Sequence, residues 1–235
     1  MQIRQINQSD YDEWDEFCMR SSNSGFIHTT LSMRFYIDCS FSVLAEQKSF
    51  FISEGKEILA AVPVFVEERD NVKRLGFGGG PLPLPVLNDS LSQSTRKKVL
   101  RRAMEVLDEI AYEAGAEKID MAVSHLNSSY IEKPQKYNYL LEYGFLDRSN
   151  TTCIVDLALR EDELLKGFTK GHEAAVKASL KKLTCEIISS DKVNHEEIRQ
   201  FQEDYYRIAG KITRPQNTFD IIYEWIKPGR EKLIK

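Results

Sequence analysis

Four lysines recur at helical spacing about three-quarters of the way along this chain and could together bind an anion. At about 100° per residue they fall within one narrow arc of a helix: Lys166, Lys170, Lys177 and Lys181. Apolar residues occupy a second arc that can face a core: Leu165, Phe168, Val176, Leu180 and Leu183. A lysine run on an amphipathic helix is equally typical of a solvated surface. The pattern predicts one helix over 163–183, whose lysine face either binds an anion or is ordinary surface.

A glycine- and proline-rich segment at 76–85 is the second candidate for chemistry. Its clustered glycines expose backbone N–H groups, which can bind phosphates. Walker loops and dinucleotide fingerprints continue directly into a helix, however, and Pro81, Pro83 and Pro85 exclude one here. The same objection applies to the likeness between 73–78 and the pyrophosphate loop of acetyl-CoA-dependent acetyltransferases. We expect a structural turn or a loop that lines a groove for an extended substrate.

The histidines and cysteines do not form a recognisable reactive arrangement. The histidines lack metal-ligand spacing: His28, His125, His172 and His195. The cysteines are widely spaced, without a Cys-x-x-Cys pair: Cys18, Cys39, Cys153 and Cys185. No Gly-x-Ser-x-Gly segment marks a nucleophile. We expect no metal, no bound cofactor and no covalent catalysis, and we interpret His28 as a residue at the start of a helix that bonds to backbone.

The composition narrows the functional classes. The 235 residues are 42% hydrophobic and 29% charged, which is typical of a globular protein. The net charge of -4 argues against a protein that wraps duplex DNA, because that task needs a strongly basic surface. No stretch approaches the ~20 apolar residues of a membrane span or resembles a signal peptide. We expect a cytoplasmic protein, with peripheral contact to membrane-bound substrates left open.

A mixed α/β lobe over 1–160 must position the glycine-rich segment. Helical spacing and capping residues predict helices at 10–21, 30–37, 91–114 and 137–143. β-prone runs separated by turns predict strands at 42–45, 50–52, 58–66, 118–123 and 151–157. This order predicts an α+β fold with a mixed, mostly antiparallel sheet flanked by helices.

The remainder of the chain predicts a joining region and an incomplete second lobe. Residues 161–190 contain the lysine helix and a strand at 185–188. Two amphipathic helices at 195–209 and 218–226 follow, without a sheet of their own on which to bury their apolar faces. We therefore expect 191–235 to be the beginning of a second lobe that is cut short.

Four segments of the sequence, in order, carry a resemblance to a known family. The first is Trp14-x-x-Phe17 followed by Gly25-Phe26-Ile27-His28-Thr29, and the second is Leu59-Ala60-Ala61-Val62-Pro63-Val64 with Gly79-Gly80-Pro81-Leu82. The third is Lys170-Gly171-His172-Glu173-Ala174-Ala175-Val176-Lys177-Ala178, and the last runs from Phe201 and Tyr205 to Ile212-Thr213-Arg214-Pro215 and Phe219. Together they resemble the Fem-type (FemAB-like) peptidoglycan-bridge aminoacyltransferases, which are built from acetyltransferase-like (GNAT) lobes. The resemblance implies a GNAT-like first lobe and the start of a second.

The resemblance also implies a function and a set of substrate-binding residues. Family members pass an acyl or aminoacyl group to an amine on a cell-wall or polysaccharide precursor, without a metal. In better-understood members the donor is aminoacyl-tRNA and the acceptor is a nucleotide- or lipid-linked muramyl peptide, whose phosphates meet basic residues. The matching positions are Arg34, Lys170 and Lys177, with His172 where an arginine is more usual. We add Gly79 and Gly80 of the groove-lining loop and Arg214 of the second-lobe motif.

The sequence departs from the family at two points, which leaves alternatives open. Val123-Ser124-His125 stands where the family has an acidic residue, so the general base is unassigned and Asp120 is a weak substitute. The coiled-coil arm of some tRNA-using members is also absent, so the donor is either aminoacyl-tRNA or an acyl-thioester such as acyl-CoA. The alternatives to a transferase are a non-catalytic substrate-binding lobe and a single-lobe acetyl-CoA-dependent N-acetyltransferase.

Overall fold

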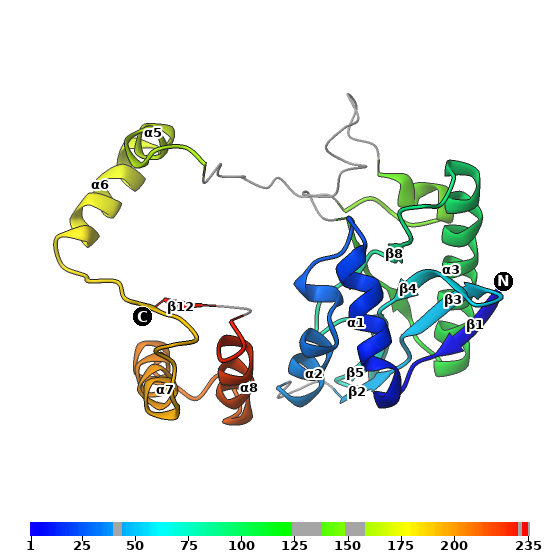
Figure 1. Ribbon diagram of the computed structural model, residues 1–235, viewed down its shortest axis with the longest axis horizontal. Helices are drawn as coiled ribbons and strands as arrows, with labels where there is room; N and C mark the ends of the chain where they lie inside the picture. The colour runs from blue at the N-terminus through cyan, green and yellow to red at the C-terminus, as the bar shows by residue number, and fades with distance from the viewer. Residues whose placement is uncertain (40–43, 124–137, 149–157, 230–231, 235) are drawn as a thin grey trace. The chain divides into compact units, whose positions relative to one another are not determined.

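The computed structural model describes residues 1–39, 44–123, 138–148, 158–229 and 232–234, and the chain divides into two compact units (Figure 1). Unit 1 consists of Met1–Asp147 and Arg214–Thr218, and unit 2 consists of Arg148–Thr213 and Phe219–Lys235. The predicted strand at 151–157, with Cys153, lies outside the described residues, as does His125.

Unit 1 is built on two four-stranded sheets. The first has the order β1-β3-β4-β8 and is antiparallel throughout: β1 (Gln2–Gln5), β3 (Phe50–Glu54), β4 (Glu57–Val62) and β8 (Val86–Leu87). The second has the order β2-β5-β6-β9: β2 (Leu44–Gln47), β5 (Phe65–Arg69), β6 (Val72–Gly76) and β9 (Lys118–Ile119). Its β6–β9 pair is parallel, as is a separate pair of β7 (Leu82–Pro83) with β10 (Met121–Ala122). The mixed, mostly antiparallel α+β fold predicted from the sequence is confirmed.

The two sheets meet at a corner formed by Ser49 and Val64. Pro63 has no N–H group and ends β4, so the single strand predicted over 58–66 is divided into β4 and β5. The buried Ser49 hydroxyl accepts a hydrogen bond from the Val64 N–H at 3.0 Å and lies 3.2 Å from the Val64 carbonyl oxygen. The serine side chain satisfies the buried Val64 N–H group, and the Val64 carbonyl oxygen also accepts the Lys48 N–H at 2.9 Å.

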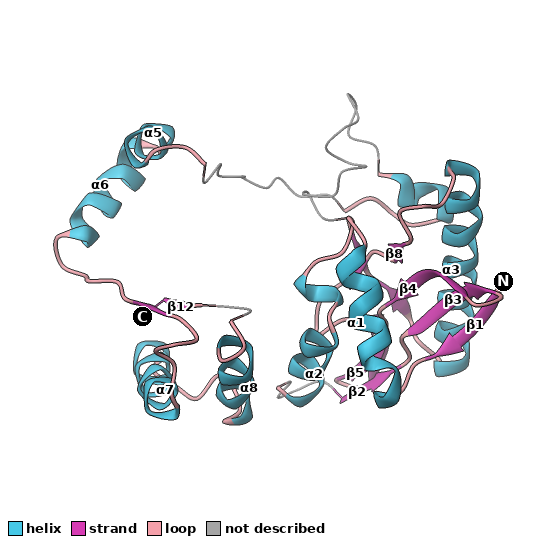
Figure 2. Ribbon diagram, viewed as in Figure 1, coloured by secondary structure: helices cyan, strands magenta, loops and turns pink. Residues whose placement is uncertain are grey.

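Helices cover both faces of the sheets in unit 1 (Figure 2). Their bounds are η1 (Gln8–Asp10), α1 (Tyr11–Arg20), η2 (Phe26–His28), α2 (Thr30–Asp38), α3 (Gln93–Ala114) and η3 (Tyr139–Tyr143). On β3, Phe51 packs against Trp14 of α1 at a ring separation of 5.1 Å, whereas its neighbour Phe50 points to the opposite face, which α3 covers. The helix predicted at 137–143 is a shorter 3-10 helix, and the other three predictions agree with α1, α2 and α3 to within two residues.

Unit 2 has a small core of its own. Its elements are α5 (Glu161–Gly167), α6 (Lys170–Leu180), β11 (Ile187–Ile188), α7 (His195–Ala209), α8 (Asn217–Ile226) and β12 (Leu233–Ile234), although the first two residues of α8 belong to unit 1. Antiparallel β11 and β12 pack with the last two helices, burying Ile188, Ile198 and Phe219 among others. The expectation that these helices lack a sheet is therefore wrong. The strand before them, β11, pairs with the strand after them, β12, to form a two-stranded sheet.

The single lysine helix predicted over 163–183 is also wrong. The segment forms two helices, α5 and α6, separated at Phe168 and Thr169. Thr169 is extended and its hydroxyl caps α6 by accepting the His172 N–H at 3.4 Å, a role in which threonine is favoured over a helix-interior position. Gly167 weakens the preceding turn further. No residue of α5 or α6 is buried, so the expected apolar arc does not face a core among the described residues.

Candidate functional site

The glycine-rich segment forms a tight turn between β6 and β7, which is closed by a single antiparallel bridge and which we call the glycine turn (Phe77–Gly80). Phe77 and Gly80 exchange backbone hydrogen bonds of 3.0 and 3.1 Å, and the two central residues have positive φ angles. These are +62° at Gly78 and +83° at Gly79, as in the two-residue hairpin turns that match strand twist. The segment is therefore a structural turn without a following helix, as the prolines predicted.

Gly78 also allows α2 to approach the glycine turn closely. A Cβ atom at Gly78 would lie 2.0 Å from Cδ1 of Tyr36, well inside van der Waals contact. The Tyr36 ring packs on Phe77 at 5.1 Å with an interplanar angle of 72°. The turn thus needs glycine at Gly78 both for its φ angle and for the space that the tyrosine occupies.

A cavity of about 380 Å³ adjoins the turn, and we call it the glycine-turn cavity. It is lined by Gly78 and Gly80 of the turn, His28 of η2 and Tyr36 of α2, and by the proline segment 81–84. Its walls are mainly aromatic and aliphatic, with backbone groups and few polar side chains. Concave surfaces of this size and character are typical of small-ligand sites.

His28 lines this cavity, but both of its ring nitrogens are hydrogen-bonded to backbone groups. Its Nδ1 accepts the Gly25 N–H at 3.0 Å, so the neutral ring carries its proton on Nε2, which lies 3.1 Å from the Leu84 carbonyl oxygen. The His28 carbonyl oxygen in turn accepts the Trp14 indole N–H at 2.6 Å. Burial lowers the pKa of His28 below its ordinary value of 6.5, and the hydrogen bond to the Leu84 carbonyl oxygen only partly offsets this. The interpretation of His28 as a backbone-bonded residue at a helix start is confirmed.

A buried ion pair supports the glycine turn from beneath. The Glu67 carboxylate lies 3.0 and 3.1 Å from Nη2 and Nε of Arg74, and it accepts the Gly79 N–H at 2.9 Å. The Glu67 side chain is 1% exposed and that of Arg74 is 18% exposed. Sequence reasoning missed this pair, although its signal was available: Glu67 and Arg74 are opposite each other on the β5–β6 hairpin.

Asp120 lies where the strand after α3 changes partner. Its N–H donates to Leu75 at 3.4 Å and its carbonyl oxygen accepts the Leu82 N–H at 2.8 Å, so β9 pairs with β6 and β10 pairs with β7. The Asp120 carboxylate is 2.9 Å from Lys118 Nζ and 3.8 Å from Arg74 Nη1. It is therefore engaged with two cations, and its use as a general base remains a prediction.

The structure places the predicted substrate-binding residues in two groups. In unit 1, Gly80 lines the glycine-turn cavity and exposed Gly79 lies above Glu67. Arg34 is exposed on α2, near Tyr11: burial raises the pKa of that phenol, while a hydrogen bond with Gln47 and the charge of Arg34 lower it. The Arg214 guanidinium lies 5.9 Å from the ring centre of Phe35, the neighbour of Tyr36.

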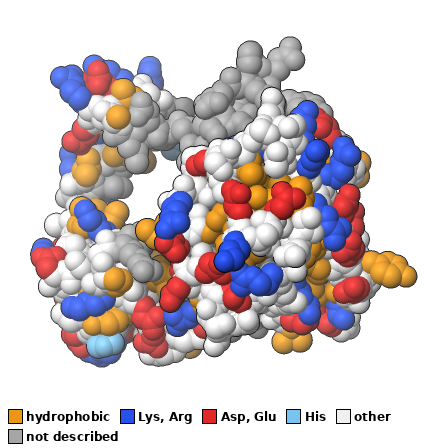
Figure 3. All heavy atoms as spheres, turned by 45° about the vertical axis from the view of Figure 1, so that its right-hand side comes forward, with side chains coloured by type: hydrophobic (Ala, Val, Ile, Leu, Met, Phe, Trp, Pro, Cys, Tyr) orange, Lys and Arg blue, Asp and Glu red, His pale blue; other side chains and the backbone are white. Residues whose placement is uncertain are grey.

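The other three predicted residues belong to unit 2, on α6. Lys170 is exposed in the first turn, and His172 Nδ1 is 3.3 Å from the hydroxyl of Thr169. Lys177 forms an ion pair with Glu173 at 2.5 Å, so its charge is partly compensated. On the face shown in Figure 3, acidic and basic side chains are interspersed, in keeping with the net charge of -4.

Two observations concern cofactors and membranes. Within the described ranges, His, Cys, Asp and Glu side chains form no group of three or more that could hold a metal ion. A search of the helices in the same ranges finds none with the length and apolar character to cross a bilayer.

Comparison with known proteins supports the fold. No protein-family model and no curated protein matches the sequence. Among solved structures, the crystal structure of FemX superposes with a TM-score of 0.57 at 15% sequence identity. The match covers 95% of this chain and 54% of FemX, so the chain spans about half the length of that protein. At this identity the likeness establishes a Fem-type fold.

Proposed function

We propose that this chain binds the acceptor in a Fem-like acyl- or aminoacyltransferase, which forms an amide on an amine of a cell-wall or polysaccharide precursor. The observation that carries the proposal is the likeness to FemX over 95% of the chain, in agreement with the four colinear segments that resemble the Fem family. The acceptor is a nucleotide- or lipid-linked saccharide or muramyl peptide, and the donor is a charged tRNA or an acyl-CoA.

The glycine-turn cavity suits the uncharged part of such an acceptor. Tyr36 and Pro81 offer flat apolar surfaces on which a sugar ring can pack, and the backbone of Gly80 allows close approach. The charged phosphates would need cations outside this apolar cavity. We assign that role to Arg34 and Arg214, which belong to unit 1 as the cavity does. The predicted acceptor-binding residues of unit 2, Lys170, His172 and Lys177 on α6, are kept as a separate proposal.

The polar groups around the cavity favour binding over proton transfer. Amide formation from an activated ester requires positioning, removal of a proton from the incoming ammonium and donors for the oxyanion. His28 and Glu67 are buried, and both form hydrogen bonds to backbone groups that maintain the fold. Asp120 is ion-paired. This supports a second candidate function for the chain by itself, a substrate-binding lobe without catalytic activity.

Ligand-dependent stabilisation tests the proposal. A UDP-linked muramyl peptide at about 100 times its Kd should stabilise the chain by about 2.7 kcal/mol, and acetyl-CoA should not. Tyr36→Ala should abolish this gain. Tyr112→Ala is the matched control, because Tyr112 is 89% exposed on α3 and does not line the cavity. Stabilisation by acetyl-CoA alone would instead support a single-lobe acetyltransferase.

Turnover then separates the transferase from the binding lobe. We expect the purified chain to bind the muramyl peptide but to form little or no amide with either aminoacyl-tRNA or acyl-CoA. Robust amide formation by residues 1–235 would show that the chain is a complete transferase, and that a base outside the three engaged groups acts in it.

A further inference from the structure

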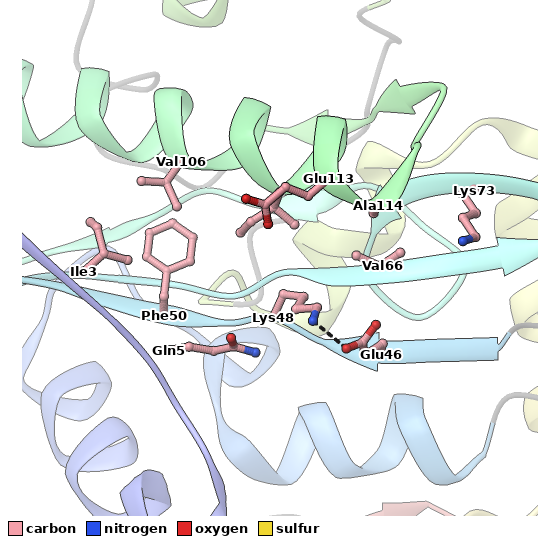
Figure 4. A pocket seen from close by; sticks show the side chains of 11 residues that line it. Ile3, Gln5, Glu46, Lys48, Phe50, Val66, Lys73, Val106, Glu113 and Ala114 are labelled. Atoms are coloured by element: carbon pink, nitrogen blue, oxygen red, sulfur yellow. Dashed lines mark ion pairs between the residues drawn. The ribbon is translucent and has the colours of Figure 1, made fainter.

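Two cavities of unit 1 differ in the charge of their walls. The larger, of about 490 Å³, lies beneath α3, and Figure 4 shows the charged side chains that line it: Glu46, Lys48, Lys73 and Glu113. By contrast, no Asp, Glu, Lys or Arg among the described residues lines the glycine-turn cavity. A charged ligand group would lose its hydration there without gaining a counter-charge. The part of a ligand that enters the glycine-turn cavity is therefore neutral.

Three polar side chains line the glycine-turn cavity, and they differ in what they can offer a ligand: Asn23, His28 and Tyr36. Both ring nitrogens of His28 are used by backbone groups. Tyr36 carries a single hydroxyl on a ring that packs against Phe77. Asn23 carries N–H donors and a carbonyl acceptor side by side, with capacity for several hydrogen bonds, so it can bind a ligand in addition to its contacts within the fold. This pair of groups is the complement of an amide.

The segment that carries Asn23 is fixed on both sides. Ser22 and Asn23 lie in a turn after α1, and Ser22 donates its N–H and its hydroxyl to the two carboxylate oxygens of Asp89, at 2.7 and 2.9 Å. On the other side, the Gly25 N–H donates to His28 Nδ1 at 3.0 Å. A polar side chain on such a support loses little freedom when it binds a ligand, which favours discrimination between similar ligands.

The apolar lining beside Asn23 narrows the kind of ligand group further. Ile27 of η2 lines the same cavity, as do Pro81, Pro83 and Leu84. An acetamido group combines a methyl group, which apolar walls favour, with one N–H and one carbonyl, which a carboxamide side chain can pair. A hydroxyl lacks the methyl group, and an amino group or a carboxylate is charged. The lining therefore suits an acetamido group better than these alternatives.

We propose that Asn23 determines specificity in the glycine-turn cavity by hydrogen-bonding the acetamido group of a neutral N-acetylated sugar. The inference rests on the proposed function, because it takes the saccharide of the acceptor as the ligand of this cavity. It adds which group of the acceptor is selected and which residue selects it. No covalent step is involved.

Calorimetric titration of the purified chain with UDP-N-acetylglucosamine and with UDP-glucose tests the ligand group. The two compounds differ only in carrying an acetamido group or a hydroxyl at one ring carbon. We expect UDP-N-acetylglucosamine to bind about tenfold more tightly. Equal affinities would overturn the inference and leave the proposed function in place. If neither compound binds, the inference is overturned, and titration with the UDP-linked muramyl peptide shows whether the proposed function fails with it.

A variant tests the residue. Asn23→Ala should bind UDP-glucose as the wild type does and UDP-N-acetylglucosamine about tenfold more weakly, so that the preference disappears. A purely structural role of Asn23 would weaken both compounds by the same factor and leave the preference unchanged, which would refute the assignment. Gln93→Ala is the matched control, because this exposed carboxamide on α3 does not line the cavity. Loss of the preference in the control would also refute the assignment.

A second variant keeps the test decisive if Asn23→Ala does not fold. Asn23→Asp preserves the shape of the side chain and its preference for turns, but it removes the N–H donors and adds a charge. This variant should therefore lose the preference for the acetamido sugar as well. Melting curves show whether each variant is folded. A folded Asn23→Asp protein that retains the tenfold preference would contradict the proposal, and the comparison of the two compounds on the unchanged chain decides the ligand group in either case.

Discussion

Replacing Gly78 by alanine should destabilise unit 1 far more than the same change at its two glycine neighbours in the turn. At Gly78 the new methyl group meets both an unfavourable φ of +62° and Cδ1 of Tyr36 at 2.0 Å. At Gly79 the φ of +83° is also unfavourable, but the nearest atom is Arg74 Nη2 at 3.8 Å. At Gly80 the nearest atom is the Phe77 carbonyl oxygen at 3.4 Å, and φ is not in the left-handed region.

The magnitudes follow from these two contributions. A left-handed conformation costs a residue with a Cβ about 1–2 kcal/mol. Overpacking against a fixed ring adds about 1–3 kcal/mol, because Tyr36 must leave its contact with Phe77. We therefore expect a loss of about 2–5 kcal/mol for Gly78→Ala and about 1–2 kcal/mol for Gly79→Ala. Gly80→Ala should change stability by less than about 1 kcal/mol.

Urea denaturation of the three variants measures these losses as shifts in midpoint at constant slope. A double-mutant cycle isolates the clash: in a Tyr36→Ala background, Gly78→Ala should cost only the conformational share of about 1–2 kcal/mol. The reasoning is refuted if Gly78→Ala costs no more than Gly79→Ala, or if its cost is the same with and without the tyrosine ring.

Three further outcomes are expected. Arg34→Ala, Lys170→Ala and Lys177→Ala should each weaken binding of a UDP-linked muramyl peptide by about tenfold at low salt without lowering the melting temperature; titrations indifferent to all three would leave these cations as ordinary surface. Glu67→Gln should lower the free energy of unfolding by about 3 kcal/mol, because it leaves a mostly buried arginine without its counter-charge; an unchanged urea midpoint would contradict this. Because the folded pKa of His28 lies below its unfolded value, its contribution to stability is present above about pH 6.5 and is lost as the pH falls toward the folded pKa. His28→Gln should therefore make the melting temperature depend less on pH between about pH 7.5 and about pH 5.5. Identical pH profiles of the melting temperature for the variant and the wild type would argue against this role.

Local signals predicted the elements whose boundaries are set by neighbouring residues. The helix α3 has continuous amphipathic spacing, an N-cap at Ser92 and a stop at Gly115, and its observed bounds differ from the prediction by two residues at one end. The glycine turn was predicted not to continue into a helix, because the prolines act locally. In both cases, the residues that decide the conformation lie within a few positions of it.

Predictions failed where a local interruption competed with a periodic pattern. The spacing of lysines and leucines over 163–183 indicated one helix, but Thr169 caps a new helix within that pattern. The apolar run at 58–66 indicated one strand, but Pro63 interrupts it. The strand corner then depends on the hydroxyl of Ser49, which is distant in the sequence and carries no recognisable signal.

The candidate site was only partly predictable, because residues that are distant in the sequence build it. The glycine-rich loop was identified, but the cavity beside it depends on Tyr36 from α2 and His28 from η2, which only the fold brings to the turn. The Glu67–Arg74 pair could have been found from the hairpin register once the turn at Asp70 and Asn71 was recognised.

The central claim, that the glycine-turn cavity binds a muramyl-peptide acceptor, is tested most directly by NMR titration of the ¹⁵N-labelled chain with a UDP-linked muramyl peptide. We predict that the largest amide shift changes lie at Gly78, Gly80, His28 and Tyr36, and that they saturate. Amides around Glu113 on α3, which does not line the glycine-turn cavity, should not move. Shift changes that are absent, or that are confined to residues far from the glycine turn, would contradict the account.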